Sequence, residues 1–259
     1  MPDPREKVLN TSFFGEHEYP RQITGDGAHK IYLATTERTL AILADDTLLR
    51  KMQIADSVHI ITSVCNELYY DSSRHELIVA YSHGCRKVSE SNGKVLQHLR
   101  GSKGATIRND TLFTVMNYAL FMNPDKVPGA AVTTPNLYTV FADNTGRLWV
   151  GADRGLLLHR NGCWRCDQAS MRQTPDSCFE QVFPRQINVR VNAINQLDNG
   201  SLVLATLGKG VFVIRQGKIS EVSLGTPQQN MVNDLAVHGN IAWAATEKGL
   251  VRIDFSDYP

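Results

Sequence analysis

The feature that most constrains the fold of this chain is an internal repeat with a period of about 40 residues. One unit contains a strand-like run, a turn rich in Asn, Gly or Asp, a second run, a polar turn that ends in Gly, and a third run. The unit is clearest in residues 140–156 (VFADNTGRLWVGADRGL), and it recurs in residues 191–211 and 232–250. The repeat predicts that short antiparallel strands follow one another along the chain.

The last residue of the polar turn aligns the copies. This anchor is Thr39, Gly84, Gly155, Gly210 or Gly249 in five clear copies, and Ala119 in a degenerate sixth. The residue four positions before the anchor is small in every clear copy: Thr35, Ala80, Gly151, Thr206 and Ala245. The residue six positions before it is large and apolar: Leu33, Ile78, Trp149, Leu204 and Trp243. The residue after it is also apolar: Leu40, Cys85, Leu156, Val211 and Leu250. Columns this uniform indicate one structural unit used repeatedly.

Repeats of this length with three or four short strands are typical of β-propeller blades. No segment has the apolar period of 3.6 residues that helical repeats show. The sequence therefore predicts an all-β fold, a β-propeller of six four-stranded blades in one domain, residues 1–259. The predicted blades are residues 15–56, 57–100, 101–131, 132–182, 183–224 and 225–259. Residues 5–14 are expected to complete the last blade, so that pairing of the two chain ends closes the ring. The alternative is a fragment of a larger propeller.

The composition excludes several classes of partner. The 259 residues carry 27 Lys and Arg against 26 Asp and Glu, a net charge of +1, so no non-specific nucleic-acid surface is expected. No apolar run reaches the roughly 18 residues that a membrane-spanning helix needs. The N-terminus (MPDPREK) lacks the basic start and apolar stretch of a secretory signal.

One copy of the repeat resembles a known family. Residues 143–151 (DNTGRLWVG), followed by Arg154-Gly155-Leu156, resemble the two-component regulator propeller repeat, which reads roughly D-x-x-G-x-L-W-[IV]-G-T-x-x-G-L. The copies at residues 198–211 and 239–250 match in part, and the resemblance covers about half of the chain. It implies an extracytoplasmic sensor propeller that binds a ligand, often a carbohydrate fragment, and signals to a kinase or cyclase module. Because the absence of a signal peptide favours the cytoplasm, the localisation stays open.

The residue before the anchor is basic in all five clear copies. It is Arg38, His83, Arg154, Lys209 or Lys248, and it is Tyr118 in the degenerate copy. These residues fall in the turn between the second and third strands, on the face where propellers usually bind ligands. A ring of them would hold a carboxylate, sulfate or phosphate group at the channel mouth, because Arg binds such groups bidentately and Lys adds a point charge. The alternative is a set of ordinary solvated turns, with acidic neighbours that offset the charge.

The five cysteines allow two interpretations of one segment. His159, Cys163, Cys166 and Cys178 have the residue types of a zinc site. However, Cys163 and Cys166 lie three apart on an expected strand and would point to opposite faces. No metal or cofactor is therefore predicted, and ordinary packing or free thiols are expected. A disulfide from Cys178 to Cys163 or Cys166 is the alternative if the chain is exported.

Catalytic motifs are not found. The chain has no G-x-S-x-G elbow, no H-E-x-x-H helix and no phosphate-binding Gly-rich loop. The spacing of Asp143, Gly146 and Trp149 resembles the aspartate box of sialidases, which is a structural turn. We therefore expect a non-enzymatic sensor whose partner is a small-molecule or oligosaccharide ligand. A propeller hydrolase or lyase acting on a lactone or glycan, and a protein-interaction scaffold, are the alternatives.

Overall fold

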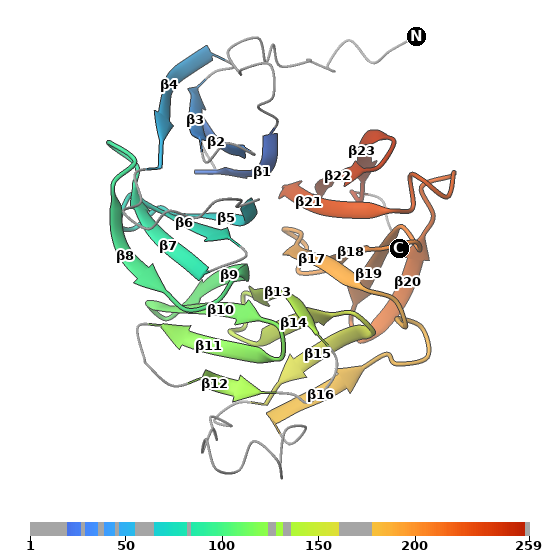
Figure 1. The fold of residues 1–259 in the computed structure, drawn as a ribbon. Helices are drawn as coiled ribbons and strands as arrows, with labels where there is room; N and C mark the ends of the chain where they lie inside the picture. Colours follow the sequence, from blue (N-terminus) through green and yellow to red (C-terminus); the bar gives the residue numbers. More distant parts are fainter. Residues whose placement is uncertain are drawn as a thin grey trace, which may run out of the picture. The chain divides into compact units, whose positions relative to one another are not determined.

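The computed structural model describes residues 20–26, 29–35, 39–44, 47–54, 65–81, 84–123, 128–131, 136–160 and 178–256 (Figure 1). Over these residues the chain is all β, with 23 strands and no α-helix. In this part of the chain no helix has the length and apolar character needed to cross a membrane. The chain divides into two compact units, Met1–Gln97 and His98–Pro259, which we describe in turn.

The first unit is built from two four-stranded sheets. One sheet contains β1 (Pro20–Gly25), β2 (Lys30–Thr35), β3 (Thr39–Ala44) and β4 (Thr47–Gln53). The other contains β5 (Cys65–Asp71), β6 (Glu76–Tyr81), β7 (Gly84–Ser89) and β8 (Val95–Leu99), whose last residues pass into the second unit. Both sheets are antiparallel meanders in chain order, and β1 and β5 contact each other.

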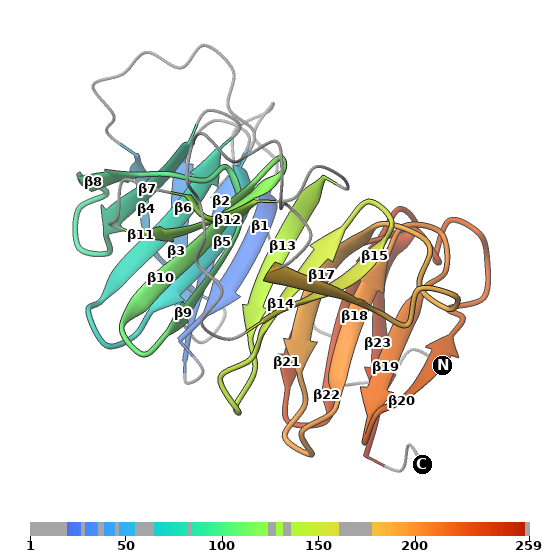
Figure 2. The same ribbon diagram turned by 90° about the horizontal axis from the view of Figure 1, so that it is seen from below.

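The second unit is built from four more meanders. The first two contain β9 (Lys103–Arg108), β10 (Thr111–Met116), β11 (Ala119–Asn123) and β12 (Pro128–Ala131), then β13 (Leu137–Ala142), β14 (Leu148–Ala152), β15 (Gly155–His159) and β16 (Phe179–Val182). The last two contain β17 (Val191–Gln196), β18 (Leu202–Thr206), β19 (Val211–Arg215) and β20 (Lys218–Val222), then β21 (Val232–His238), β22 (Ile241–Thr246) and β23 (Gly249–Asp254). The first strands of these sheets, β9, β13, β17 and β21, contact one another in that order. Figure 2 shows the order of β17 to β20 across one sheet.

Two meanders in the first unit and four in the second, with their first strands in contact within each unit, confirm the predicted fold class, an all-β propeller of six blades. Five of the described sheets have four strands and the last has three. The strand expected from residues 5–14 to complete the last sheet lies outside the described residues.

The apolar columns of the repeat form the core between neighbouring sheets. Leu33, Ile78, Trp149 and Leu204 are all buried, and so are Leu40, Cys85, Leu156 and Val211. The small column is explained by close packing. A Cβ added to Gly151 would lie 2.6 Å from Thr139 Cγ2 and 2.7 Å from the carbonyl oxygen of Val191 in the next sheet. The position therefore has no room for a side chain in that blade, and glycine is required there.

Each meander has two different ends. The turn between the second and third strands lies at the same end as the start of the first strand, because Leu137 at the start of β13 pairs with Ala152 at the end of β14. We call this the 2–3 end. The turns that join the first to the second strand and the third to the fourth lie at the opposite end, which we call the 1–2 end.

Candidate ligand-binding site

The structure places the described members of the predicted basic ring at the 2–3 ends of the second unit. Tyr118, Arg154 and Lys248 lie in two-residue turns, which connect the pairs Met116–Ala119, Ala152–Gly155 and Thr246–Gly249. Lys209 lies in the turn between β18 and β19. Arg38 and His83 lie outside the described residues. The positions are equivalent from blade to blade, while their role in binding stays a prediction.

The side chains of these turns are solvated. Tyr118 is 45% exposed, and Arg154 and Lys248 are exposed as well. Lys209 is half-buried, and its Nζ donates a weak hydrogen bond of 3.4 Å to the carbonyl oxygen of Gln186. Among the described residues no hydrogen bond or ion pair joins one member of the ring to another. The side chains of these turns are therefore separate from one another and do not by themselves form a connected anion site.

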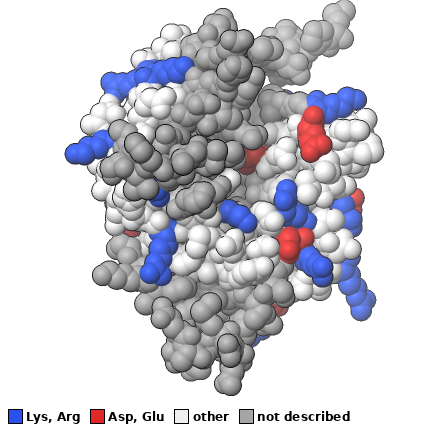
Figure 3. All heavy atoms as spheres, viewed as in Figure 1, with Lys and Arg blue, Asp and Glu red and all other residues white. Residues whose placement is uncertain are grey.

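The surface charge is dispersed in the same way. On the face shown in Figure 3, the Lys and Arg side chains that are coloured lie among uncharged and acidic residues. They do not gather into one continuous basic surface there. This dispersion agrees with the net charge of +1.

A feature that sequence reasoning missed lies next to these turns, in the first strand of each blade. The pairing between the first and second strands shifts by one residue near the 2–3 end in every sheet, which leaves one bulged residue. The bulged residues are Arg21, Asn66, Gly104, Tyr138, Asn192 and Asn233. A β-bulge redirects a side chain and is common beside binding sites. The three Asn residues were a signal in the sequence, since an apolar strand has little other use for them.

Tyr138 is the centre of the most specific arrangement at this end. The Nζ atom of Lys103 lies 4.1 Å from the centroid of the Tyr138 ring, and the guanidinium carbon of Arg190 lies 4.7 Å from it. Lys103 begins β9 and Arg190 directly precedes β17, so the cations come from the strands on either side of β13. Cation–π contacts of this kind stabilise a positive charge by about 0.5–2 kcal/mol. We call these three residues the Tyr138 cluster.

The charges of the Tyr138 cluster are not neutralised by any described carboxylate. Lys103 makes only a 3.5 Å hydrogen bond to the carbonyl oxygen of Leu137, and neither cation forms an ion pair with a described residue. The Nε atom of Arg190 is buried and has no hydrogen-bond partner among the described residues. A buried donor without a partner is costly. The cluster therefore offers donors and positive charge to an anionic group.

The aspartate-box turn has the structural role that its sequence suggested. The carboxylate of Asp143 accepts hydrogen bonds from the backbone and hydroxyl of Thr145, from the backbone and Nε of Arg147, and from Nε1 of Trp149, at 2.7–3.0 Å. Burial alone would raise the pKa of Asp143, but these bonds outweigh it and lower the pKa. The turn lies at the 1–2 end, away from the Tyr138 cluster.

The expectation of free thiols in the cysteine segment is wrong for Cys178, where the structure has the alternative, a disulfide. Cys178 is disulfide-bonded, which leaves it no thiolate for a metal, and its partner lies outside the described residues. His159 is buried and its ring lies 5.5 Å from that of Phe179, edge to face. Cys163 and Cys166 lie outside the described residues. Within the described part of the chain, no group of three metal-binding side chains comes together.

Comparison with known proteins gives structural neighbours only. No protein-family model matches the chain, and no curated protein is significantly similar to it. Two extracellular domains from B. thetaiotaomicron, assigned to a one-component and a hybrid two-component system, superpose with TM-scores of 0.66 and 0.65 at 11% sequence identity. They match over 95% and 94% of this chain. The chain spans only 34% and 40% of their length.

An enzyme of similar size has the same fold. Virginiamycin B lyase from Staphylococcus aureus, in a catalytically inactive form with Quinupristin, superposes with a TM-score of 0.68 at 11% identity. The match covers 98% of this chain and 89% of the lyase. Identities this low show a shared fold and leave the function to the site. The chain is thus a β-propeller, the fold that it shares with these structural neighbours.

Proposed function

We propose that this protein is a non-enzymatic sensing propeller that binds a small anionic ligand at the 2–3 end of its second unit. The observation that carries the proposal is the Tyr138 cluster, in which two cations without a described counter-ion converge on one aromatic ring. An acidic sugar fits this chemistry. Its carboxylate or sulfate would pair with Arg190 and Lys103, and its ring would lie beside Tyr138.

The ring of turn residues would extend this site. Arg154, Lys209 and Lys248 lie at the same end of their sheets as the Tyr138 cluster, so a longer oligosaccharide would reach them. In this proposal the inner cluster provides specificity, because its donors are half-buried and fixed by the strands. The solvated turns would add charge and increase the association rate. Signalling to a kinase or cyclase module is the role that the sensor-like fold suggests.

The proposal is tested by thermal shift and calorimetry with uronic-acid and sulfated oligosaccharides. Binding is expected to weaken as salt increases, since the cluster is only half-buried. Arg190→Gln and Lys103→Gln should each reduce the affinity about tenfold, the loss typical of one charge-assisted hydrogen bond. Arg154→Ala should reduce it less. Lys218→Gln, which changes an exposed lysine at a 1–2 end, is the control. A screen in which no anionic oligosaccharide binds would contradict the proposal.

The lyase neighbour supports a second candidate function, because it is matched over nearly its whole length. A propeller lyase would convert its substrate and not merely bind it. Incubation of the protein with candidate lactones, glycans and Quinupristin, with and without added divalent metal, followed by mass spectrometry, distinguishes the two functions. Product formation that is lost in a Tyr138→Phe or Arg190→Gln variant would favour the enzyme.

A further inference from the structure

A groove in the first unit is separate from the site described above. It lies between the two sheets of that unit, has a volume of about 680 Å³, and is open to solvent. Its lining residues are Lys30, Ile42, Leu49, Arg50, Arg74, His75, Ser89, Glu90 and Ser91. Most of them lie in or beside the turns that join β1 to β2, β5 to β6 and β7 to β8. The groove is therefore at the 1–2 end, opposite to the turns that contain the predicted ring.

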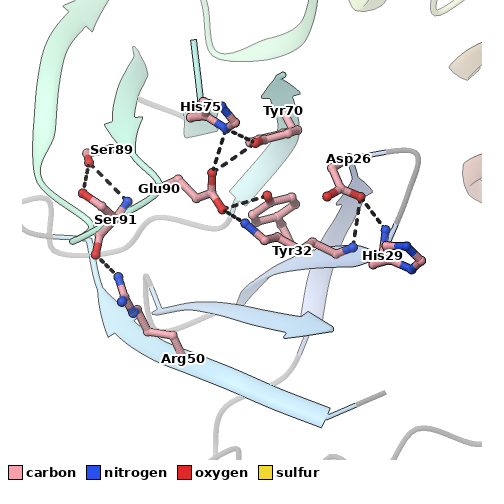
Figure 4. Close-up of polar contacts among 10 residues, drawn as sticks. Asp26, His29, Tyr32, Arg50, Tyr70, His75, Ser89, Glu90 and Ser91 are labelled. Atoms are coloured by element: carbon pink, nitrogen blue, oxygen red, sulfur yellow. Dashed lines mark hydrogen bonds and ion pairs between the residues drawn. The ribbon is translucent and has the colours of Figure 1, made fainter. Parts of the chain in front are cut away.

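Glu90 fixes one wall of the groove (Figure 4). Its carboxylate accepts hydrogen bonds from Lys30 Nζ at 2.6 Å and from the hydroxyl groups of Tyr32 and Tyr70 at 3.1 and 3.0 Å. His75 Nδ1 lies 3.5 Å from the same carboxylate and 3.0 Å from the Tyr70 hydroxyl. The rings of Tyr32 and Tyr70 are stacked with centroids 4.5 Å apart. This network joins the two sheets and gives the wall a single rigid arrangement.

The same hydrogen bonds satisfy the Glu90 carboxylate, which is negatively charged. Glu90 has the one carboxylate among the described lining residues, and its oxygens accept hydrogen bonds from Lys30 and the two tyrosines. Arg74 is paired with Asp71 at 3.0 Å. Burial raises the pKa of Tyr32 and of Tyr70, so both hydroxyls stay protonated as donors at neutral pH. Among the described lining residues, no carboxylate is left without a partner to hold a cationic ligand.

Arg50 supplies the positive charge that remains. Its Nη1 atom donates to the carbonyl oxygen of Ser91, which holds the guanidinium against the turn between β7 and β8. Within the described part of the chain it forms no ion pair with a carboxylate. The hydroxyl groups of Ser89 and Ser91 share one hydrogen bond of 2.9 Å, in which either of them can donate. A guanidinium fixed in this way has further N–H groups that are suited to a carboxylate, sulfate or phosphate.

The other side of the groove is apolar. Ile42 is buried there, and Leu49 on β4 is 58% exposed, so its apolar surface is available to a ligand. An exposed leucine next to a fixed arginine matches a ligand that has an apolar part attached to an anionic group. A purely polar anion would leave Leu49 in contact with water.

We propose that this groove is a second ligand site, which binds a small amphiphilic anion. The anionic group of the ligand pairs with Arg50 and approaches Arg74, and its apolar part covers Leu49. A carboxylate and a sulfate or phosphate ester share this chemistry, so they are distinguished by experiment. The site is independent of the Tyr138 cluster, and the proposed function can fail without affecting it.

The test uses hexanoate, hexyl sulfate and hexyl phosphate as probes, with hexan-1-ol and inorganic sulfate as partial ligands, and binding followed by calorimetry and by NMR shifts. At least one hexyl anion should bind, while hexan-1-ol and inorganic sulfate should bind at least about tenfold more weakly. Arg50→Gln should weaken binding of the hexyl anion about tenfold. Leu49→Ser should weaken the hexyl anion but leave inorganic sulfate unchanged.

A control substitution outside the groove separates binding in the groove from a general effect of lost positive charge. Arg185→Gln, which removes an exposed arginine of the second unit, should bind the hexyl anion as the wild type does. Because Arg50 and Leu49 are exposed, their variants should keep the wild-type melting temperature. Equal binding by the wild type and Arg50→Gln, or no binding of any hexyl anion, would overturn the proposal.

Discussion

The carboxylate of Asp143 and the indole of Trp149 are joined by a 2.8 Å hydrogen bond inside one blade, with the Asp143 side chain fully buried. The bond connects the turn between β13 and β14 to the apolar column of the repeat, because Trp149 is one member of that column. Arg147 adds a 2.7 Å ion pair to the same carboxylate and lies over the Trp149 ring. In the copy of the repeat that best matches the family pattern, Asp143 thus holds the turn between β13 and β14 against Trp149.

Asp143→Ala should therefore destabilise the protein strongly. The change removes the acceptor for Trp149 Nε1 and for the backbone of the turn, and a buried donor without a partner costs about 1–3 kcal/mol. We expect a loss of about 3 kcal/mol in the free energy of unfolding, measured by urea denaturation. Asp198→Ala, in the corresponding turn of the next blade, is the control, because Asp198 is exposed. A loss of similar size in both variants would contradict this account.

The hydrogen bonds of Glu90 should make the free energy of unfolding decrease at acidic pH. Burial raises the pKa of Glu90, but the hydrogen bonds from Lys30, Tyr70 and Tyr32 outweigh it, so the pKa lies below the ordinary value of 4.5. The ionised carboxylate therefore contributes its full stability above pH 4.5, and this contribution is lost as the pH falls through the lower pKa of the folded state. The free energy of unfolding of the wild type should decrease more steeply below pH 4.5 than that of Glu90→Gln. Parallel curves would exclude the network as the cause.

The ion pair between Lys30 and Glu90 should also lose its contribution to stability at high pH. Its hydrogen bond with Glu90 raises the pKa of Lys30 above 10.5. A raised pKa in the folded state contributes stability below pH 10.5 that is lost at higher pH. Lys30→Met should abolish this alkaline loss, and a pH series of melting temperatures measures it. Lys218→Met, which changes an exposed lysine of the second unit, should keep the wild-type profile.

The cysteines should differ in reactivity. Cys65 and Cys85 are free and buried, and burial raises the pKa of Cys85 to about 12. Neither should react with iodoacetamide in the folded protein, and both should react after denaturation. Cys178 should stay unmodified in denaturant until a reductant is added, because it is disulfide-bonded. Peptide mass spectrometry separates these cases, and alkylation of Cys178 without reductant would contradict the disulfide.

Close packing between blades should make Gly151 irreplaceable. An alanine there would place its Cβ within 2.7 Å of backbone and side-chain atoms of the two neighbouring first strands. Overpacking of this kind typically costs about 1–3 kcal/mol. Gly151→Ala should lower the free energy of unfolding by this amount in urea denaturation. Ala205→Ser, at a buried position of β18 outside the small column, is a comparison for a change of one atom. A Gly151→Ala variant as stable as the wild type would contradict the packing argument.

The sequence alone determined the blades. Strand alternation, Asn-Gly turns and the small and large columns are properties of one repeat, so they are readable without knowledge of any other part of the chain. The positions of Tyr118, Arg154, Lys209 and Lys248 in equivalent turns follow from the same local pattern. Whether these residues form a binding ring is a question about distances between repeats, which no single repeat contains.

Only the tertiary structure shows which charged residues contact each other. Lys103, Tyr138 and Arg190 belong to three different blades, and Lys30 lies 60 residues from its partner Glu90. The bulge that singles out Tyr138 depends on the register between two strands, which hydrogen bonding sets. Each of these sites joins residues that are distant in the chain, and packing of one blade against the next brings them together.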